Sequence, residues 1–594
     1  MSILASLVRA YDRLPDAPPF GYSMEKIGIV VGLHADGTVA SVTDWREGEG
    51  KKRKPRPMLV PQAVKRTAGI APNFLWDKTS YVLGVTAGGG KRTNEEHDAF
   101  KELHEKKIAD NDDPGLKALL LFLRQWSPDQ FGSPLWSDEM KDQNVIFVLE
   151  SDRRDHLWLH LRPAARALWS QASDTGEGDK QICLVTGHRS GIARLHPSIK
   201  GVWGAQSSGA AVVSFNLDAF TSYEHKQGEN APVSDAAAFA YTTMLNRFLE
   251  RDSKHRIQIG DASSVFWADG SDAEVVSIAE GAFAVMFDGV DEAARDEAET
   301  GKVGILLERL RRGEALETLD PKLTKGVRFH VLGLAPNAAR LSVRFYFEDD
   351  FGVLAENYQR FVDEMRIEPM WREPYPPLWR YLCEVAVLGK RENVPPNLAG
   401  EWMRAILNGT AYPLTLLSAV LSRIRADGEV NALRASILRA LLVRNFKMAP
   451  NSGDKIREAP VSLDPENRNK GYLLGRLFAV YEQAQTAALG RNVNATIKDK
   501  FYGSASATPR SVFALLERGS ANHLSKVGKI RPGQRVNLEK AIGSIMEMMS
   551  PEDDPFPASL NAAEQAMFGL GYYHQRGAFF RKHDYAADTE EAAQ

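Results

Sequence analysis

The sequence is poor in cysteine and has no long hydrophobic run. Only two cysteines, Cys183 and Cys383, occur in 594 residues, and they are far apart in the chain. This number excludes a disulfide framework or a cysteine-based zinc site, and it fits the reducing cytoplasm. No stretch of 18 or more apolar residues is present, so we expect no membrane-spanning helix and no membrane partner. Near the start, Arg9, Asp12 and Arg13 interrupt a helical apolar face, which is not typical of a signal peptide or anchor.

An excess of charge of one sign is also missing. The chain has 74 Lys and Arg against 77 Asp and Glu, a formal net charge of −3, so overall charge gives no argument for binding nucleic acid. The charges are nevertheless clustered. Residues 46–66 carry eight basic residues against two glutamates, residues 476–540 carry eleven against four acids, and residues 269–300 carry ten acids against Arg295. We expect the acidic stretch to be a solvated helix, with a partner surface or a mimic of nucleic acid as alternatives.

Patterns that resemble catalytic motifs are incomplete. In GVTAGGGKRT (84–93), Val85 stands where a phosphate loop needs its first glycine and Arg92 replaces the hydroxyl, so a flexible basic loop is expected. His156 and His160 are four residues apart, but no Glu follows His156 and the segment LWLHL favours a strand over a zinc helix. We find no nucleophile elbow, no Cys–His pair and no carboxylate cluster. We therefore expect no enzymatic activity, no catalytic residue, no metal and no cofactor.

The pattern of helix and strand signals along the sequence predicts an α+β fold. A mixed α/β N-terminal region is followed by an all-α C-terminal helical bundle. Up to about residue 373, β-rich runs alternate irregularly with helical periods. The expected strands are Lys26–Leu33, Val145–Leu149, Gln181–Thr186, Ala211–Phe215, Val265–Trp267 and Ala339–Phe347, and the expected helices are Ala236–Glu250 and Gly304–Arg312.

Beyond the Pro-Tyr-Pro-Pro boundary at 374–377, strand signals nearly vanish. Amphipathic helices are expected at Leu378–Leu388, Leu398–Leu407, Pro413–Ala426, Val430–Asn445, Leu473–Ala488, Thr508–Glu517 and Leu538–Met549. The stretch 447–470 is rich in Pro, Asn, Asp and Ser and has the composition of a linker. We therefore divide the chain into 1–373 (mixed), 374–446 (helical), 447–470 (linker) and 471–594 (helical bundle).

Two polar stretches contain more glycine, amide and hydroxyl groups than a core needs. In the stretch 61–77, a Gly- and Pro-braced loop places Asn73 beside Phe74 and Trp76, just after basic residues. Asn can pair with a base edge, aromatic rings can stack or wedge, and cations can neutralise phosphate. The alternative is that Phe74 and Trp76 simply belong to the core.

The second polar stretch runs from Thr186 to Ala210 and ends in the small polar segment GAQSSGA (204–210). Its backbone amides can approach a nucleic-acid backbone closely, and Gln206 can reach a base. The alternative is a tight hairpin loop. A third stretch, 332–340, is interpreted as architectural.

Ordered segments over nearly the whole chain resemble the large subunit family of the type I-C CRISPR Cascade. The resemblance is carried by VPQAVKRTAGIAPNFLWDKTSYVLG (60–84), CLVTG (183–187), ARLHPSIKGVWGAQSSGA (193–210), VSFNLDAFTSYEHKQGENAPVS (213–234), AYTTMLN (240–246), IGDASSVFWA (259–268), LGLAPNAARLSVRFY (332–346), LGRLFAVYEQAQ (474–485), ATIKDKFYGSASATP (495–509) and LGYYHQR (570–576).

This resemblance implies a non-catalytic part of an RNA-guided complex in the prokaryotic cytoplasm. The subunit would recognise the short PAM in target double-stranded DNA, help to open the duplex, hold the R-loop and recruit a separate helicase–nuclease. Its expected partners are the CRISPR guide RNA, the target DNA, and the backbone and guide-end-capping subunits of the complex. The helical end resembles the family's small subunit, which can be made from an internal start, and Met448 is the candidate start here.

Within this framework we assign three sets of residues. The PAM or DNA contacts are Asn73, Phe74, Gln206, Ser207 and Ser208. The phosphate contacts are Lys51, Lys52, Arg53, Lys54, Arg56, Lys65 and Arg66. The single-strand contacts of the C-terminal bundle are Arg476, Arg491, Lys498, Lys500, Arg510, Lys526, Lys529, Arg531 and Arg535, for which a solvated bundle face is the alternative.

Two other functions remain open. A metal-dependent nuclease or nucleotide-dependent enzyme would need acidic metal ligands or a true phosphate loop. A protein-only scaffold of a ribonucleoprotein would use the basic runs merely as surface.

Overall fold

The computed structural model describes residues 2–48, 53–64, 66, 69–132, 134–174, 180–215, 217–287, 302–372, 375–448, 458–490 and 495–580. Contacts between Cα atoms divide the chain into two compact units. The first unit comprises residues 1–198 and 213–245, and the second comprises 199–212 and 246–594. The compositional boundaries at residues 373, 446 and 470 lie within the second unit and remain predictions. No described helix is both long enough and apolar enough to cross a bilayer.

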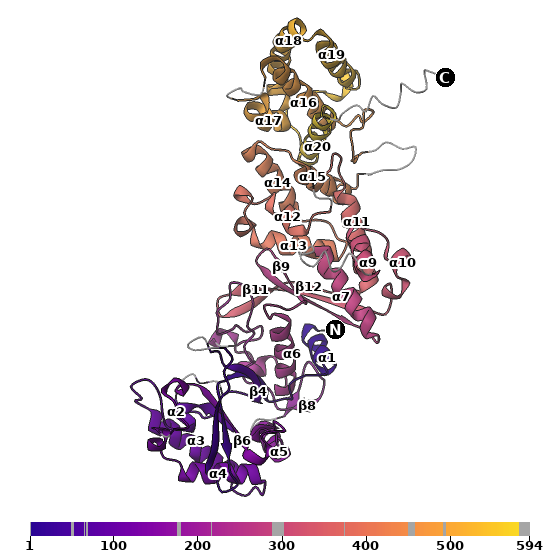
Figure 1. Ribbon diagram of the computed structural model, residues 1–594. Coiled ribbons are helices and arrows are strands. Elements are labelled where there is room, and N and C mark those ends of the chain that lie inside the picture. The colour runs from indigo at the N-terminus through magenta and orange to yellow at the C-terminus, as the bar shows by residue number, and fades with distance from the viewer. Residues whose placement is uncertain are drawn as a thin grey trace, which may run out of the picture. The chain divides into compact units, whose positions relative to one another are not determined.

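The first unit is built on a mixed sheet with the strand order β3-β2-β6-β5. Figure 1 labels β6 of this sheet, together with helices α3 and α4. Strand β2 (Ile29–Leu33) runs parallel to β6 (Asn144–Leu149), and β3 (Val39–Asp44) and β5 (Trp76–Lys78) are antiparallel edge strands. Every residue of β2 is buried, as expected for a continuous apolar strand covered on both faces.

Each face of this sheet has its own cover. Helices α3 (Thr93–Ile108) and α4 (Pro114–Gln125) supply Phe100, Leu116 and Leu119 to the core that includes Ile29 and Val31. On the other face, Val30 packs with residues of the ribbon formed by β1 (Tyr22–Ile27) and β4 (Arg56–Pro61). The first unit is completed by α1 (Ile3–Asp12), α5 (Pro163–Asp174), the two-residue strands β7 (Gln181–Ile182) and β8 (Arg189–Ser190), and the beginning of α6 (Asp235–Phe248).

The second unit begins with an antiparallel sheet in the order β12-β11-β10-β9. Its strands are β9 (Arg256–Ile259), β10 (Ala262–Asp269), β11 (Arg328–Asn337) and β12 (Arg340–Asp350). The inward side chains of this sheet, such as Phe266, Phe329 and Phe345, join one continuous core with the helices. These helices are α7 (Ala273–Phe287), α9 (Lys302–Arg311), α10 (Leu316–Leu319), α11 (Phe351–Met365), α12 (Leu378–Cys383), α13 (Pro396–Leu407), α14 (Leu414–Asp427) and α15 (Ala432–Arg444).

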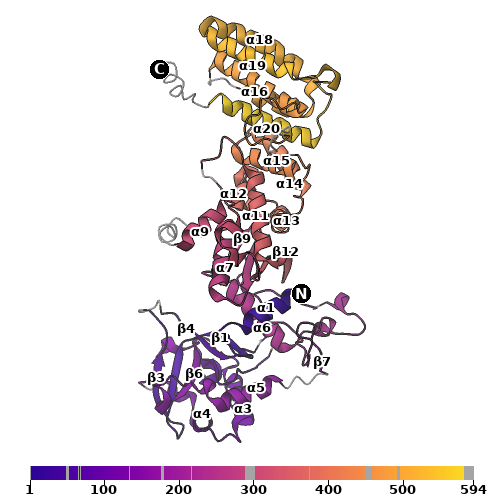
Figure 2. The ribbon, with the colours of Figure 1, turned by 90° about the vertical axis from the view of Figure 1, so that its right-hand side faces the viewer.

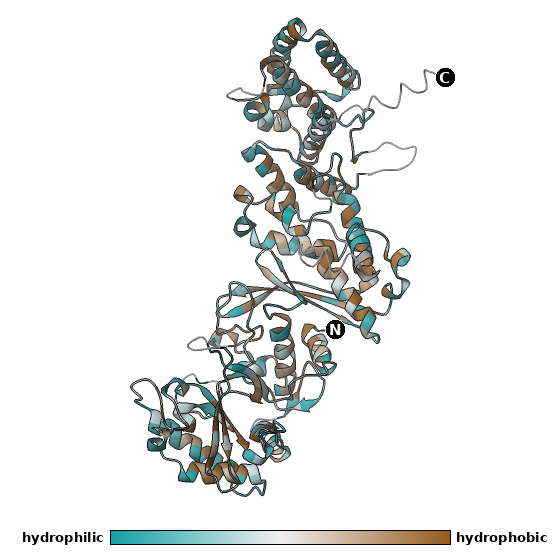
Figure 3. Ribbon diagram, in the orientation of Figure 1, coloured by the Kyte–Doolittle hydropathy of each residue, from teal (hydrophilic) through white to brown (hydrophobic). Residues whose placement is uncertain are grey.

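All the regular secondary structure in the described residues of the C-terminal part is helical. It contains α16 (Lys470–Leu489), α17 (Ile497–Ala507), α18 (Phe513–Ile530), α19 (Pro532–Glu547) and α20 (Ala562–Ala578), which Figure 2 shows from a second side. Helices α16 and α20 cross closely because glycines line the crossing. A Cβ on Gly475 would lie 2.0 Å from the Phe568 carbonyl oxygen, and one on Gly571 would lie 2.2 Å from that of Tyr472. Apolar residues concentrate where the helices pack (Figure 3).

The predicted α+β class with a helical C-terminal part is confirmed, but several elements differ from the prediction. The segment around His156 is not a strand: His156 has φ 53°, and a 3₁₀ turn follows at Leu159–Leu161. Residues 211–215 form only an isolated bridge between Ala211 and Arg340. The helix predicted at 508–517 is interrupted because Pro509 favours an end to α17, and α18 starts only at Phe513.

Candidate nucleic-acid interface

The first basic cluster lies on the connection between β3 and β4. Glu47 and Lys54 exchange two backbone hydrogen bonds of 2.8 Å and so form an isolated antiparallel bridge. Just before it in the chain, Asp44 accepts two 2.8 Å hydrogen bonds from Arg46 and one from Arg53. Chiefly because of Arg46, the pKa of Asp44 falls to about 2. Arg46 and Arg53 therefore stabilise the backbone next to this bridge as well as contributing charge.

The remaining cations of this cluster differ in their availability. Arg56 pairs with Glu47 at 3.1 Å and lies 4.9 Å from the centre of the Trp45 ring. Lys54 is exposed and has no ion pair with any described residue. Lys51, Lys52 and Lys65 lie outside the described residues. Lys54 is thus the predicted phosphate contact that the described structure leaves most available.

The loop that carries Asn73 is closed by its own side chains. The Asn73 Oδ1 accepts a 2.8 Å hydrogen bond from the Val64 amide, and the Asn73 amide donates at 2.8 Å to Asp77 Oδ2. Arg66 pairs with the same carboxylate, donates at 2.7 Å to the Ala71 carbonyl and lies over the Tyr81 ring. Burial raises the pKa of Asp77, and Arg66 opposes this rise. Arg66 and Asn73 therefore hold the loop together.

Phe74 belongs to the core of the first unit. Its ring is stacked against His104 at 5.7 Å and against Trp169 at 5.4 Å between ring centres. The Trp76 indole donates at 2.7 Å to the Pro61 carbonyl. The described conformation therefore supports the alternative of core packing for Phe74, and it offers no face of this ring to a base.

The second polar loop, in the other unit, is displayed rather than buried. Ile199 and Ala210 exchange two 2.9 Å backbone hydrogen bonds that close the loop, and Val202 and Ala210 are buried beneath it. Gln206, Ser207 and Ser208 are all exposed at its tip. These three side chains are available to a partner molecule.

The backbone of this loop is braced on three sides. The Trp203 amide donates at 3.0 Å to Ser263 Oγ on β10. Gly201 has φ 86°, and a Cβ there would lie 2.5 Å from the Leu249 carbonyl oxygen. A Cβ on Gly204 would touch Pro336, near the end of β11. The structure thus brings this loop next to the 332–340 stretch, which acts as its support, in agreement with an architectural role.

The site prediction did not include Trp203, whose side chain is 58% exposed in this loop. Lys200 is also exposed and has no ion pair among the described residues. The sequence did contain a signal for Trp203, since it stands between glycines in a polar loop. An aromatic residue outside any apolar period of a helix or strand is a candidate for exposure. The loop therefore presents an aromatic surface, an amide, two hydroxyls and a cation together.

The C-terminal cations separate into paired and unpaired sets. Arg476 is buried, donates to Gln575 and to the Pro465 carbonyl at 3.1 Å each, and has its pKa lowered by burial. Arg510 pairs with Asp554 at 2.6 Å and Arg535 with Glu539 at 2.7 Å. Arg491 lies outside the described residues. Arg476 therefore supports the bundle core rather than its surface.

The unpaired cations gather on α18 and α19. Lys526, Lys529 and Arg531 are exposed at the end of α18, and no described carboxylate pairs with them. Arg518 and Lys540, which the site prediction left out, are also exposed and without a described carboxylate partner. So is Lys500 on α17, whereas Lys498 is half-buried. These positions add exposed positive charge without an ion pair to α17, α18 and α19.

Metal ligands are not grouped in the described parts of the chain, where no cluster of three or more His, Cys, Asp or Glu could hold an ion. The glycine-rich segment 84–93 is a loop before α3, as predicted, and its Thr86 hydroxyl donates at 2.6 Å to Asp142. Met448, the candidate internal start, follows α15 and packs partly against the core; its role in translation remains a prediction.

Comparison with known proteins gives one family. The family of the CRISPR-associated protein (Cas_Csd1) matches residues 7–580, which is nearly the whole chain and includes both compact units. A search among curated proteins gave no match. The resemblance noted in the sequence is thereby confirmed over its full extent. The chain belongs to the Cas_Csd1 family of CRISPR-associated proteins, the family of the type I-C Cascade large subunit.

Proposed function

We propose that this protein is the large, non-catalytic subunit of an RNA-guided type I-C surveillance complex. In this role it recognises the PAM in duplex DNA, helps to unwind the duplex, holds the R-loop and recruits a separate helicase–nuclease. It works in the prokaryotic cytoplasm with guide RNA, target DNA and the backbone and guide-end-capping subunits. Family membership supports a place in a CRISPR complex, and the surfaces described above support contact with nucleic acid.

The observation that carries this proposal is the braced loop 199–210. Its support on Ser263, Leu249 and Pro336 fixes the backbone, so that little conformational entropy is lost when DNA binds. Gln206 can form paired hydrogen bonds with a base edge, and Ser207 and Ser208 can bond to either bases or phosphates. We therefore assign PAM contact to this loop, with Asn73 and Arg66 as positioning residues of the loop in the first unit.

Phosphate binding is assigned to exposed cations in both units. Lys54 would contact duplex DNA or guide RNA, and Lys526, Lys529 and Arg531 would contact the displaced strand. Guide pairing reads the target sequence, so a protein of this kind needs only a few base contacts and a basic surface. This division of labour fits a chain in which we recognise no catalytic motif.

The test uses the assembled complex with its guide RNA. Gln206→Ala should weaken binding to PAM-bearing duplex about fivefold or more, since one paired base contact is worth roughly 1–3 kcal/mol, and should spare a target that is already unpaired. The matched control is Gln130→Ala, at an exposed glutamine of the first unit. Equal loss on both targets would remove Gln206 from PAM recognition. If the complex shifts no DNA at all, the protein-only scaffold is favoured, and metal-dependent cleavage by the purified chain would instead favour a nuclease.

A further inference from the structure

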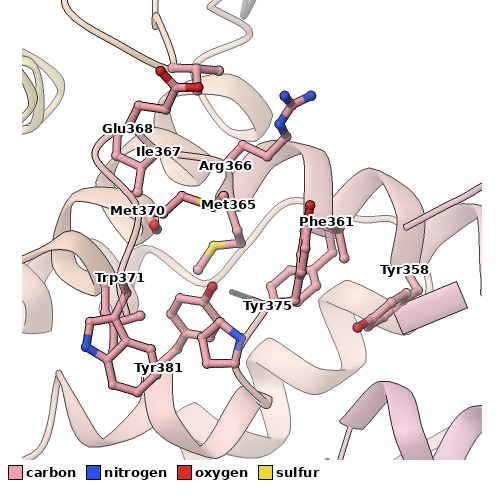
Figure 4. A pocket seen from close by; sticks show the side chains of 15 residues that line it. Tyr358, Phe361, Met365, Arg366, Ile367, Glu368, Met370, Trp371, Tyr375 and Tyr381 are labelled. Atoms are coloured by element: carbon pink, nitrogen blue, oxygen red, sulfur yellow. The ribbon is translucent and has the colours of Figure 1, made fainter. Parts of the chain in front are cut away.

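A small apolar cavity opens on the second unit, and none of its lining residues is among those assigned to nucleic acid. It has a volume of about 90 Å³ and is walled by the end of α11, the segment 366–371, α12 and α15. Figure 4 shows Phe361, Met365, Trp371 and Tyr381 gathered around it, with Arg366 and Glu368 at its edge. Two methionines, Met365 and Met370, contribute to the lining, and such side chains adapt to irregular apolar partners.

A ladder of alternating tryptophan and arginine leads away from this cavity. The Arg380 guanidinium lies 4.7 Å from the centre of the Trp371 ring and 5.1 Å from that of Trp379. The Arg391 guanidinium lies 3.9 Å from the centre of the Trp379 ring. Each tryptophan ring thus already has a cation over it, while the N–H edges of the guanidinium groups are left to bond to an acceptor.

Large apolar side chains are exposed beside the ladder. Met370 is 57% exposed at the cavity mouth, and Leu388 is 78% exposed in the turn just before Arg391. Leu388 has φ 60°, a conformation that costs energy for a branched side chain, and the turn is held by a 2.8 Å hydrogen bond from Asn393 to the Val387 carbonyl. The turn thus presents a leucine to solvent, where it is available to an apolar partner.

The charges around the cavity are unbalanced. Arg366, Arg372, Arg380 and Arg391 have no ion pair with any described carboxylate. Of the nearby acids, Glu384 is bound to Arg434 at 3.1 Å and Glu392 lies 3.9 Å from Lys390. A partner that brings carboxylates would therefore match this surface.

We propose that the cavity and the Trp–Arg ladder form a docking site for an acidic protein segment that inserts one large apolar side chain. The cavity would take the end of a leucine, methionine or aromatic residue, and Arg380 and Arg391 would bind flanking carboxylates in paired hydrogen bonds. This site lies outside the surfaces assigned to DNA and does not depend on them.

A protein segment fits this surface better than the other kinds of ligand. A cavity of about 90 Å³ is smaller than the roughly 300–1,000 Å³ of typical small-molecule sites, so it suits one side chain and not a cofactor. Nucleic acid is disfavoured because cations already lie over Trp371 and Trp379, which leaves less ring surface for stacking with bases. The exposed Met370 and Leu388 have no counterpart in a phosphate backbone.

The experiment selects a random dodecapeptide library displayed on phage against the full-length chain. We expect the enriched peptides to carry an excess of Asp and Glu around one Leu, Met, Phe or Trp. A synthetic peptide of the enriched sequence should bind at least tenfold more weakly to Met370→Glu and to Arg391→Glu. Met24→Glu is the matched control, because Met24 is 59% exposed in the first unit. The affinity of this variant for the peptide should stay within twofold of that of the unaltered chain.

Leu388→Asn serves as a variant that keeps the fold, since asparagine tolerates a positive φ; it should also lower peptide affinity. Three outcomes would overturn the proposal. In the first, the enriched peptides show no excess of Asp and Glu. In the second, a dodecamer of thymidylate displaces the bound peptide as effectively as unlabelled peptide does. In the third, the chain forms a dimer that Met370→Glu abolishes. PAM-duplex binding by the assembled complex should be unchanged by Met370→Glu, which separates this site from the proposed DNA function.

Discussion

The side-chain oxygen of Asn73 accepts a 2.8 Å hydrogen bond from the backbone amide of Val64, nine residues earlier in the chain. This bond closes the loop that the sequence suggested as a DNA contact. The backbone amide of Asn73 donates to the buried carboxylate of Asp77. Both the side-chain oxygen and the backbone N–H of Asn73 are thus bonded within the protein. A residue in this position fixes Val64 at the base of the loop, and Asp77, which it also contacts, holds Arg66.

Replacing Asn73 with alanine should therefore act through loop stability. The Val64 amide would lose its acceptor, and we expect a loss of about 1–2 kcal/mol in the free energy of unfolding of the first unit. Hydrogen exchange of peptides covering 62–77 should become faster. Ser208→Ala, at an exposed position, is the control and should leave exchange and stability unchanged. Unaltered exchange at 62–77 in Asn73→Ala would contradict this role.

Gly201→Ala should disturb the loop 199–210 without altering any exposed group on it. A Cβ at this position would lie 2.5 Å from the Leu249 carbonyl oxygen, and φ 86° adds a further cost of roughly 1–2 kcal/mol. We expect weaker binding of PAM-bearing duplex by the assembled complex and a lower melting temperature. Gly187→Ala is the control, because Gly187 also has a positive φ of 74° but has open space around it. If the two variants bind PAM duplex equally well, bracing of the loop does not matter for recognition.

The sequence predicted the fold class and the positions of most core elements, because strongly periodic or continuous apolar runs such as 145–149 and 432–444 leave little choice of structure. The prediction of a strand failed around His156, because the positive φ of this one residue excludes a strand and the sequence pattern does not reveal it. For the candidate site, composition located both polar loops, but it could not tell a displayed side chain from one used internally. Gln206 and Asn73 look alike in sequence; one is exposed, and the other is bonded to Val64.

Lys54 offers a direct test of phosphate contact in the first unit. Neutralising one phosphate contact should lower the slope of log K against log salt by about one for duplex DNA. We therefore expect Lys54→Ala to weaken binding of the assembled complex to every duplex, with or without PAM, and to flatten its salt dependence. Lys54→Arg should restore both. A slope that does not change would exclude a phosphate role for this residue.

The basic surface of α18 and α19 should bind single-stranded DNA. The combined change Lys526→Gln, Lys529→Gln and Arg531→Gln removes three exposed, unpaired cations. Each contact to a single strand contributes about 0.7 to the salt slope, so the slope should fall by about two. Lys325→Gln, which alters an exposed lysine elsewhere in the second unit, should leave the slope unchanged. If the triple variant retains full affinity for the displaced strand, this surface is only solvated.

The first unit should lose stability in mild acid. Burial lowers the pKa of His104 and His196 to about 4 and that of His160 to about 3, from 6.5 in a solvated histidine. These rings are neutral in the folded unit, whereas the unfolded chain binds protons below pH 6.5, so stability falls as the pH drops from about 6.5 towards 4. Hydrogen exchange of first-unit peptides, corrected for intrinsic rates, should thus be faster at pH 5 than at pH 7.5. His160→Phe should reduce this difference, since it removes one titrating ring; an unchanged difference would mean that His160 does not contribute to the acid sensitivity.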